Sequence, residues 1–194
     1  MASPPLALRF VKSTGDAGAL ADLGPEIAVV GRSNVGKSSL VNALANRKDL
    51  AHVSKTPGRT RLLNQYALDG GGALVDLPGY GYAAVPGRLR AGWPAMIERY
   101  LLGREQLAMA MVLVDGEIGP TKLDAQMLEW LRAHGLPHTV VATKHDKVKA
   151  SQREKRKREL AQGCSLQPGD VVWVSAAKNA GIDRLRHLVR TWVT

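Results

Sequence analysis

The sequence predicts one α/β domain with a doubly wound, mostly parallel sheet and helices on both faces. Short apolar runs typical of buried strands alternate with segments whose apolar residues recur at helical spacing. The 194 residues, 45% of them apolar, suffice for one such domain with a full core. Residues 31–38, Gly-Arg-Ser-Asn-Val-Gly-Lys-Ser, match the pattern G-x-x-x-x-G-K-[ST], which requires a strand before it and a helix after it.

The first half of the chain contains an N-terminal extension and a hairpin. Residues 1–24 precede the main domain, which we place at 25–194, and the apolar run 6–11 is expected to add one edge strand or turn. A turn of three glycines at 70–72 joins two strands, which should therefore run antiparallel. The elements expected here are a strand at 26–30, a helix from 39, a mobile loop at 46–57 and strands at 61–68 and 73–76.

Strands and helices alternate in the second half. A flexible loop is expected at 80–90, and Thr121 is expected to cap the helix that follows it. The helices are expected at 91–102, 121–134, 151–162 and 181–193, and the strands at 107–114, 138–143 and 171–174. The result is a six-stranded sheet with one antiparallel edge strand, and ligand should bind at the carboxyl ends of the strands.

Composition limits the function classes. Cys164 is the one cysteine, so neither an intramolecular disulfide nor a cysteine cluster for metal can form, which fits a reducing cytoplasm. No run approaches the roughly 18 apolar residues of a membrane span and no secretory signal is evident, so we expect a cytoplasmic protein without a membrane partner. The last 51 residues carry +7 of the net charge of +10, which suggests a nucleic-acid partner.

The loop at 31–38 is predicted to bind phosphate groups. Gly31 and Gly36 let the backbone bend so that successive N–H groups point at phosphate oxygens, and the following helix adds the positive end of its dipole. Lys37 would reach the β- and γ-phosphates, and the Ser38 hydroxyl would coordinate Mg²⁺. The candidate nucleotide contacts in this loop are Gly31, Arg32, Ser33, Asn34, Val35, Gly36, Lys37 and Ser38.

Three further clusters follow predicted strands. In Asp76-Leu77-Pro78-Gly79, of the form D-x-x-G, the Asp can hold Mg²⁺ through water and the Gly N–H can contact the γ-phosphate. In Thr143-Lys144-His145-Asp146, the final carboxylate can accept hydrogen bonds from N1 and N2 of guanine, and the lysine stem can lie along the purine ring. The backbone N–H groups of Ser175-Ala176-Ala177 can meet the guanine O6. Together, these clusters indicate a guanine-nucleotide site.

In this order and spacing, the clusters resemble the first, third, fourth and fifth boxes of a Ras-like GTPase, which implies a three-layer domain that binds GTP and GDP. The fourth box normally begins with Asn, and Thr143 replaces it here. The second box needs a Thr whose hydroxyl completes the Mg²⁺ shell. We choose Thr60, with Thr56 as the alternative, so Ser38 and Thr60 are the expected metal ligands. The nucleotide contacts expected around it are Gly58, Arg59, Thr60, Arg61 and Leu62.

Longer strings resemble a narrower family. Residues 31–40, 55–60 and 76–83 are similar to the EngB family, also called YihA or YsxC, among the TrmE-Era-EngA-YihA-Septin-like GTPases. The resemblance runs from about residue 25 to the end of the chain. It implies a bacterial enzyme, expected to be a monomer, that hydrolyses GTP to GDP and phosphate. It also implies binding to the large ribosomal subunit during assembly and a requirement in normal cell division.

The catalytic group is left unassigned by the sequence. In Ras-like GTPases a Gln after D-x-x-G orients the attacking water, but here the residue is Tyr80, so a low intrinsic rate is expected. Two interpretations of Asn34 stay open. The pattern of related GTPases implies that this Asn binds K⁺ beside the phosphates, and the alternative is that it only caps the loop.

The segment 147–158 is strongly basic and also has two interpretations. Its cations can bind phosphates of ribosomal RNA, or they can form a solvated helix face. We expect a GTP-hydrolysing switch in large-subunit assembly. The alternative is a nucleotide-gated RNA or ribosome tether in which hydrolysis is incidental. The cations concerned are Arg153, Lys155, Arg156, Lys157 and Arg158.

Overall fold

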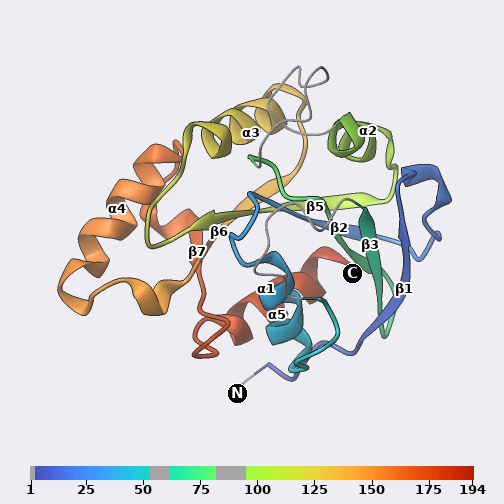
Figure 1. Cartoon of the computed structure of the whole chain (residues 1–194), viewed down its shortest axis with the longest axis horizontal. Coiled ribbons are helices and arrows are strands. Elements are labelled where there is room, and N and C mark those ends of the chain that lie inside the picture. The colour runs from blue at the N-terminus through green and yellow to red at the C-terminus, as the bar shows by residue number, and fades with distance from the viewer. Residues whose placement is uncertain (1–2, 53–61, 82–94) are drawn as a thin grey trace.

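A computed structural model of the chain describes residues 3–52, 62–81 and 95–194, which form a seven-stranded sheet between two layers of helices (Figure 1). The strand order is β1-β3-β4-β2-β5-β6-β7. The predicted α/β class, the mostly parallel sheet and the helices on both faces are confirmed. The strands are β1 (Leu8–Thr14), β2 (Glu26–Gly31), β3 (Leu63–Leu68), β4 (Ala73–Asp76), β5 (Leu107–Asp115), β6 (His138–Thr143) and β7 (Val171–Trp173).

The sheet has seven strands where six were expected, and the antiparallel strand is not at the edge. β1 comes from the N-terminal extension and pairs antiparallel with β3, with Leu8 opposite Leu68 and Thr14 opposite Leu63. β3 is also antiparallel to β4 on its other side. β3 therefore runs against the other six strands, and β1 covers its outer edge. The sequence signal for β1 is weak because Leu8 is its one fully buried residue.

Alternating side chains along the strands build one core on each face of the sheet. In β2, Ile27 and Val29 share a core with α1 and α5, whereas Ala28 and Val30 share the other with α2, α3 and α4 (Figure 1). Because β2 has helices on both faces and strands on both sides, it is apolar on both faces, which explains its clear sequence signal. The helices are α1 (Lys37–Ala45), α2 (Ala95–Gly103), α3 (Lys122–Ala133), α4 (Arg153–Gly163) and α5 (Ile182–Trp192).

α3 begins with a reciprocal capping arrangement. The Asp124 N–H donates to Oγ1 of Thr121 at 3.4 Å, and the Thr121 N–H donates to Oδ2 of Asp124 at 2.8 Å. The predicted N-cap at Thr121 is confirmed, and Asp124 is a second capping residue. Within the described ranges, no helix is both long and apolar enough to cross a membrane.

A buried carboxylate at the amino end of β2 ties the N-terminal extension to the sheet. Glu26 accepts hydrogen bonds from the Tyr100 hydroxyl at 2.9 Å, from Gln65 Nε2 at 3.1 Å and from Arg104 Nη2 at 2.8 Å. Gln65 Nε2 and Arg104 Nη2 also donate to the carbonyl of Ala21. Burial and the neighbouring Glu26 raise the pKa of Tyr100, so its hydroxyl stays a donor. This cluster lies at the end of β2 opposite the predicted ligand site.

Candidate functional site

The predicted phosphate loop connects β2 to α1 in a conformation that depends on glycine. Gly36 has φ +108°, and Asn34 has φ +63° with an exposed side chain. A Cβ atom on Gly31 would lie 2.9 Å from Val35 Cγ1 and 3.0 Å from the Leu113 carbonyl oxygen, so only glycine fits there. The loop therefore curls tightly at the carboxyl end of β2, directly before the first turn of α1.

The Lys37 side chain folds back across this loop. Its ammonium group donates to the carbonyls of Gly31 and Arg32, both at 3.3 Å. Desolvation lowers the pKa of Lys37, and the nearby Asp76 carboxylate partly opposes that shift. A cation thus lies within the curl of backbone that the sequence predicts for phosphate groups.

Asp76 ends β4 beside the start of α1. Its carboxylate is buried, and its Oδ1 has no hydrogen-bond partner among the described residues. Burial raises the pKa of Asp76 to about 6, while Lys37 and a hydrogen bond with Ser38 act in the opposite direction. A buried carboxylate oxygen beside a hydroxyl group is a donor set that suits a hard divalent cation such as Mg²⁺. The residues present therefore fit the expected metal.

The D-x-x-G turn lies against the phosphate loop. The Ser33 N–H donates to the Tyr80 carbonyl at 2.9 Å, and the Tyr80 N–H donates to the Gly31 carbonyl at 3.4 Å. A Cβ atom on Gly79 would lie 2.8 Å from the backbone nitrogen of Ser33, so a larger residue would separate the two loops. The two middle residues of the D-x-x-G turn, Leu77 and Pro78, are buried.

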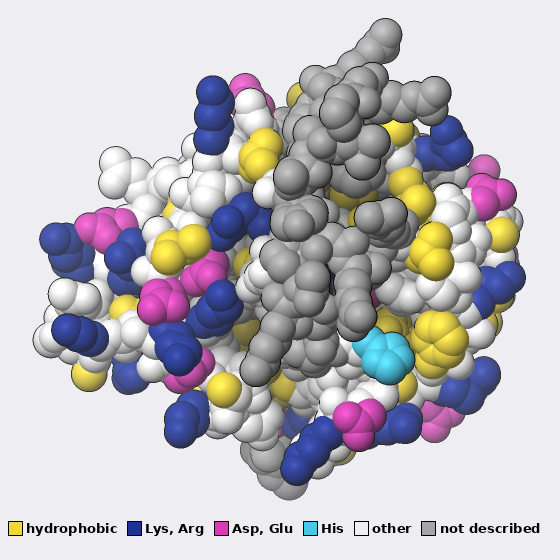
Figure 2. Space-filling view, viewed as in Figure 1, with side chains coloured by type: hydrophobic (Ala, Val, Ile, Leu, Met, Phe, Trp, Pro, Cys, Tyr) yellow, Lys and Arg dark blue, Asp and Glu magenta, His cyan; other side chains and the backbone are white. Residues whose placement is uncertain are grey.

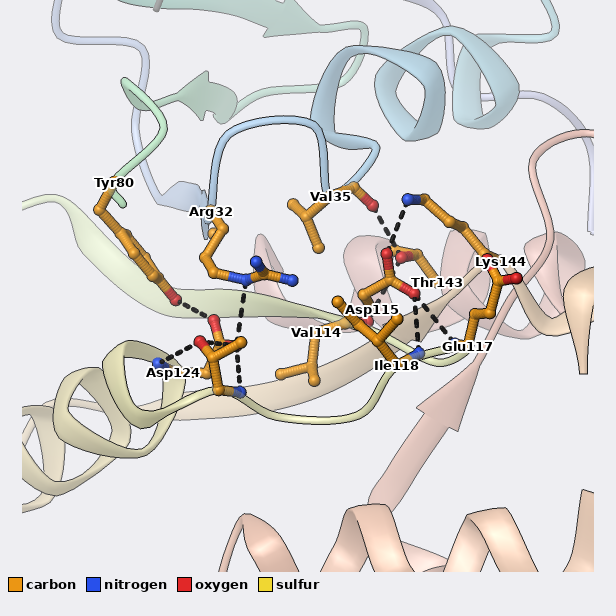
Figure 3. A network of polar contacts seen from close by, with 12 residues as sticks. Arg32, Val35, Tyr80, Val114, Asp115, Glu117, Ile118, Asp124, Thr143 and Lys144 are labelled. Atoms are coloured by element: carbon orange, nitrogen blue, oxygen red, sulfur yellow. Dashed lines mark hydrogen bonds and ion pairs between the residues drawn. The ribbon is translucent and has the colours of Figure 1, made fainter. Parts of the chain in front are cut away.

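The Tyr80 side chain is buried and points toward Asp124 (Figure 3). Its hydroxyl donates to Oδ1 of Asp124 at 2.8 Å, and Oδ2 of that carboxylate lies 3.3 Å from Nε of Arg32. Sequence reasoning missed Asp124. The spacing Thr121-x-x-Asp124, a capping pattern, was the one local signal for it.

The fourth box is held by contacts to the phosphate loop and to β5. Thr143 Oγ1 donates to the Val35 carbonyl at 2.7 Å, which ties the box to the loop. Lys144 has φ +55°, and its ammonium group donates to Oδ2 of Asp115 at 2.6 Å (Figure 3). Asp115 Oδ1 in turn accepts the N–H of Glu117 at 2.9 Å. Asp115 was also missed, because nothing local distinguishes a carboxylate at a strand end.

The fourth and fifth boxes meet through one short hydrogen bond. The Ser175 hydroxyl donates to Oδ1 of Asp146 at 2.5 Å, and the Lys178 N–H donates to the Ser175 hydroxyl oxygen at 3.1 Å. This hydrogen bond from Ser175 is the main cause that lowers the pKa of Asp146, so its carboxylate is charged at neutral pH. The ring of His145 packs on Trp173 with a centroid distance of 5.3 Å.

A cavity of about 670 Å³ at the carboxyl ends of the strands is lined by residues of both boxes and by Val35 and Gly36 of the phosphate loop. The structure thus brings together the phosphate loop, the fourth box and the fifth box, which includes Ala176 and Ala177. Leu62 is exposed, and the other second-box candidates lie outside the described residues. In the part of the chain that is described, no group of three His, Cys, Asp or Glu side chains could hold a metal. The candidates outside it are Thr56, Gly58, Arg59, Thr60 and Arg61.

Comparison with known proteins gives concordant matches. A family model described as 50S ribosome-binding GTPase matches residues 26–144. A protein named probable GTP-binding protein EngB, from Pelotomaculum thermopropionicum, is 48% identical over 170 residues, which cover 87% of this chain and 86% of that protein.

Two solved structures share the fold. The crystal structure of a probable GTP-binding protein EngB superposes with a TM-score of 0.65 at 23% identity and covers 87% of this chain and 98% of its own. Era in complex with MgGDPNP and nucleotides 1506–1542 of 16S ribosomal RNA superposes with a TM-score of 0.66 at 24% identity, covering 90% and 58%. The family model spans more than half of the chain, and the Pelotomaculum protein is 48% identical to this chain over most of its length. The chain therefore belongs to the EngB family of GTP-binding proteins and is a P-loop GTPase.

Proposed function

We propose that the protein is a GTP-hydrolysing switch in the cytoplasm that acts in assembly of the large ribosomal subunit and is needed for normal bacterial cell division. The observation that carries this proposal is that Val35 and Gly36 of the phosphate loop line the same cavity as Asp146, whose carboxylate accepts the Ser175 hydroxyl. A carboxylate in this place accepts the two N–H groups of guanine, which adenine cannot offer. The description of the matching family model, 50S ribosome-binding GTPase, supports the partner.

In this proposal the hydroxyls of Ser38 and Thr60 hold Mg²⁺, and Asp76 acts through a water molecule. The bound ion would neutralise the negative charge of the β- and γ-phosphates. Because Thr60 would be recruited through the γ-phosphate, Thr60→Ala should spare GDP binding and weaken GTP binding selectively. Nucleotide titrations of Thr60→Ala and of Thr56→Ala decide the assignment. If Thr56→Ala alone shows the selective loss, Thr56 is the ligand.

Hydrolysis should be slow without a partner. The Tyr80 side chain, which occupies the position of the water-orienting Gln, is buried against Asp124 and cannot reach a water molecule at the γ-phosphate. No residue of this chain is therefore assigned as the catalytic group. Asn34 is the site at which K⁺ would supply positive charge beside the phosphates, and its exposed side chain at the loop is compatible with that role.

The basic face of α4 is the proposed contact to ribosomal RNA. Figure 2 shows Lys and Arg side chains gathered over α4 with acidic side chains between them. Lys155 and Arg156 pair with Glu159 at 3.8 and 3.6 Å, and Lys157 pairs with Glu154 at 2.8 Å. Ion pairs between exposed or half-buried side chains such as these contribute little to stability, so phosphate groups can displace the carboxylates.

Co-sedimentation with large ribosomal subunits tests the partner. Binding should depend on the bound nucleotide and should fall linearly in log[salt] as counterions are released. Reversal of Lys155, Arg156 and Lys157 to Glu should weaken binding and reduce the salt slope by about three. A control with the same change in net charge reverses the exposed cations Arg9, Arg99 and Arg184, which lie on other elements.

The control variant should bind as wild type does, and GTP affinity should stay unchanged in both variants. Equal binding and equal salt slope in the α4 variant and the wild type would show that the α4 face is only solvated charge. The inward Tyr80 side chain favours a second candidate, a nucleotide-gated tether to RNA or the ribosome in which hydrolysis is incidental. Turnover that rises when large subunits are added supports the switch, and turnover that does not rise supports the tether.

A further inference from the structure

The buried carboxylate of Asp124 joins three segments that lie far apart in the sequence. It accepts the Tyr80 hydroxyl through Oδ1 and the Thr121 hydroxyl through Oδ2 at 2.7 Å, in addition to the Thr121 N–H. The Nε atom of Arg32 faces the same carboxylate, in an ion pair without the angle of a hydrogen bond (Figure 3). A single side chain of α3 thus holds the phosphate loop through Arg32 and the D-x-x-G turn through Tyr80. We call these contacts the Asp124 clamp.

The clamp acts on backbone that is already closely packed. Tyr80 exchanges hydrogen bonds with the loop through Ser33 and Gly31, and it also anchors the turn through its side chain. The next residue, Gly81, has φ +78°, and a Cβ atom there would lie 3.1 Å from Leu123 of α3. Burial and the Asp124 carboxylate raise the pKa of Tyr80, so its hydroxyl remains a donor. The turn is therefore fixed at the residue that follows Gly79.

We infer that Asp124 is a positioning residue for the γ-phosphate: it holds Tyr80, and Tyr80 holds the Gly79 N–H where the terminal phosphate of GTP is met. The inference rests on the proposed function, because it takes Gly79 as the γ-phosphate contact. GDP lacks that phosphate and does not reach Gly79. The Asp124 clamp therefore favours GTP over GDP by keeping one donor ordered before the ligand arrives.

The variant Tyr80→Phe tests this inference. It removes the hydroxyl and keeps the ring, so the packing volume hardly changes. When the turn is free to move, GTP binding must order the backbone of about one residue, which costs about 1–2 kcal/mol. We expect GTP affinity to fall about 5- to 30-fold relative to GDP affinity, with GDP affinity nearly unchanged. The measurement is the dissociation constant of a non-hydrolysable GTP analogue and of GDP, each with Mg²⁺.

Tyr100 provides a matched control. Like Tyr80 it is fully buried and donates its hydroxyl to a buried carboxylate, that of Glu26, at 2.9 Å, but at the opposite end of the sheet. Tyr100→Phe should lower the free energy of unfolding by an amount similar to that for Tyr80→Phe, because both lose one such hydrogen bond. It should leave the ratio of GTP to GDP affinity at the wild-type value. If Tyr80 has only a structural role, Tyr80→Phe and Tyr100→Phe should have the same free energy of unfolding and the same ratio of GTP to GDP affinity.

The outcomes separate the inference from the proposed function. If the wild type binds both nucleotides and the affinity ratio is the same in Tyr80→Phe as in Tyr100→Phe, the inference is overturned and the proposed function stands. If the wild type binds neither guanine nucleotide, the proposed function is overturned and the inference with it. Should Tyr80→Phe not fold, Asp124→Asn is measured in the same way. It removes the charge that faces Arg32, and a selective loss of GTP affinity is again the supporting result.

Discussion

The proposed base-reading role of Asp146 makes the sharpest prediction. Asp146→Asn replaces one carboxylate oxygen with an NH₂ group, which meets the N1–H or N2–H₂ donors of guanine as donor against donor. Guanosine nucleotides should bind weakly to this variant. Xanthosine nucleotides carry an oxygen in place of the N2 amine, so the new NH₂ group has an acceptor and binding should be restored.

The magnitude follows from the state of the carboxylate in the structure. Ser175 donates to Oδ1 at 2.5 Å and lowers the pKa of Asp146, so the acceptor is charged when it meets the base. Hydrogen bonds to a charged acceptor contribute about 1.5–3 kcal/mol each. Asp146→Asn loses one of these bonds outright and the charge from the acceptor of the other, which together cost about 3 kcal/mol, so GDP affinity should fall about 10²-fold. Ser175→Ala keeps the carboxylate and loses only its orientation, so its effect should be about tenfold.

Titration with fluorescent GDP and XDP measures these changes. Asp170→Asn is a suitable control, because Asp170 is an exposed capping residue that accepts the Gln167 N–H at 3.2 Å, away from the cavity. That control should bind both nucleotides as the wild type does. Unchanged GDP affinity in Asp146→Asn would refute the assignment of the fourth box. If Asp146→Asn binds both GDP and XDP weakly, the substitution disrupts the site as a whole and does not change which base it selects.

Three further predictions concern the fold, the thiol and the ion. Arg104→Met removes the cation beside the buried Glu26 carboxylate and should lower the free energy of unfolding, measured in urea, by about 3–5 kcal/mol. The double variant with Glu26→Gln should recover part of the lost stability, because the unpaired buried charge is then removed as well. Burial raises the pKa of Cys164 to about 11, so iodoacetamide at pH 8 should label it only after unfolding, and fast labelling of the native protein would contradict its burial. GTP hydrolysis should be faster in K⁺ than in Na⁺ at equal ionic strength, and Asn34→Ala should abolish the difference. Equal rates in wild type would remove K⁺ from the mechanism.

The sequence by itself determined the fold class and the chemistry of the loops. The phosphate loop is encoded by adjacent residues, because the backbone curl needs glycine at Gly31 and Gly36 and the charge needs Lys37 directly after it. The buried strands β2 and β5 were equally clear, since strands covered on both faces are apolar along nearly their whole length. The guanine boxes were predicted from their residue types, their order and spacing, and the strand before each of them, together with the resemblance to Ras-like GTPases.

Only the tertiary structure decided how these parts are held. The edge position of β1 depends on its pairing with β3. Because β1 is short and largely exposed, its own hydrophobic pattern does not predict this pairing. Asp115 is 29 residues from Lys144, and Asp124 is 44 residues from Tyr80. A carboxylate finds such a distant partner only when the packing of strands and helices brings both side chains into one buried space. Short sequence patterns therefore determine which groups can meet the nucleotide, and packing across the sheet determines which residues position them.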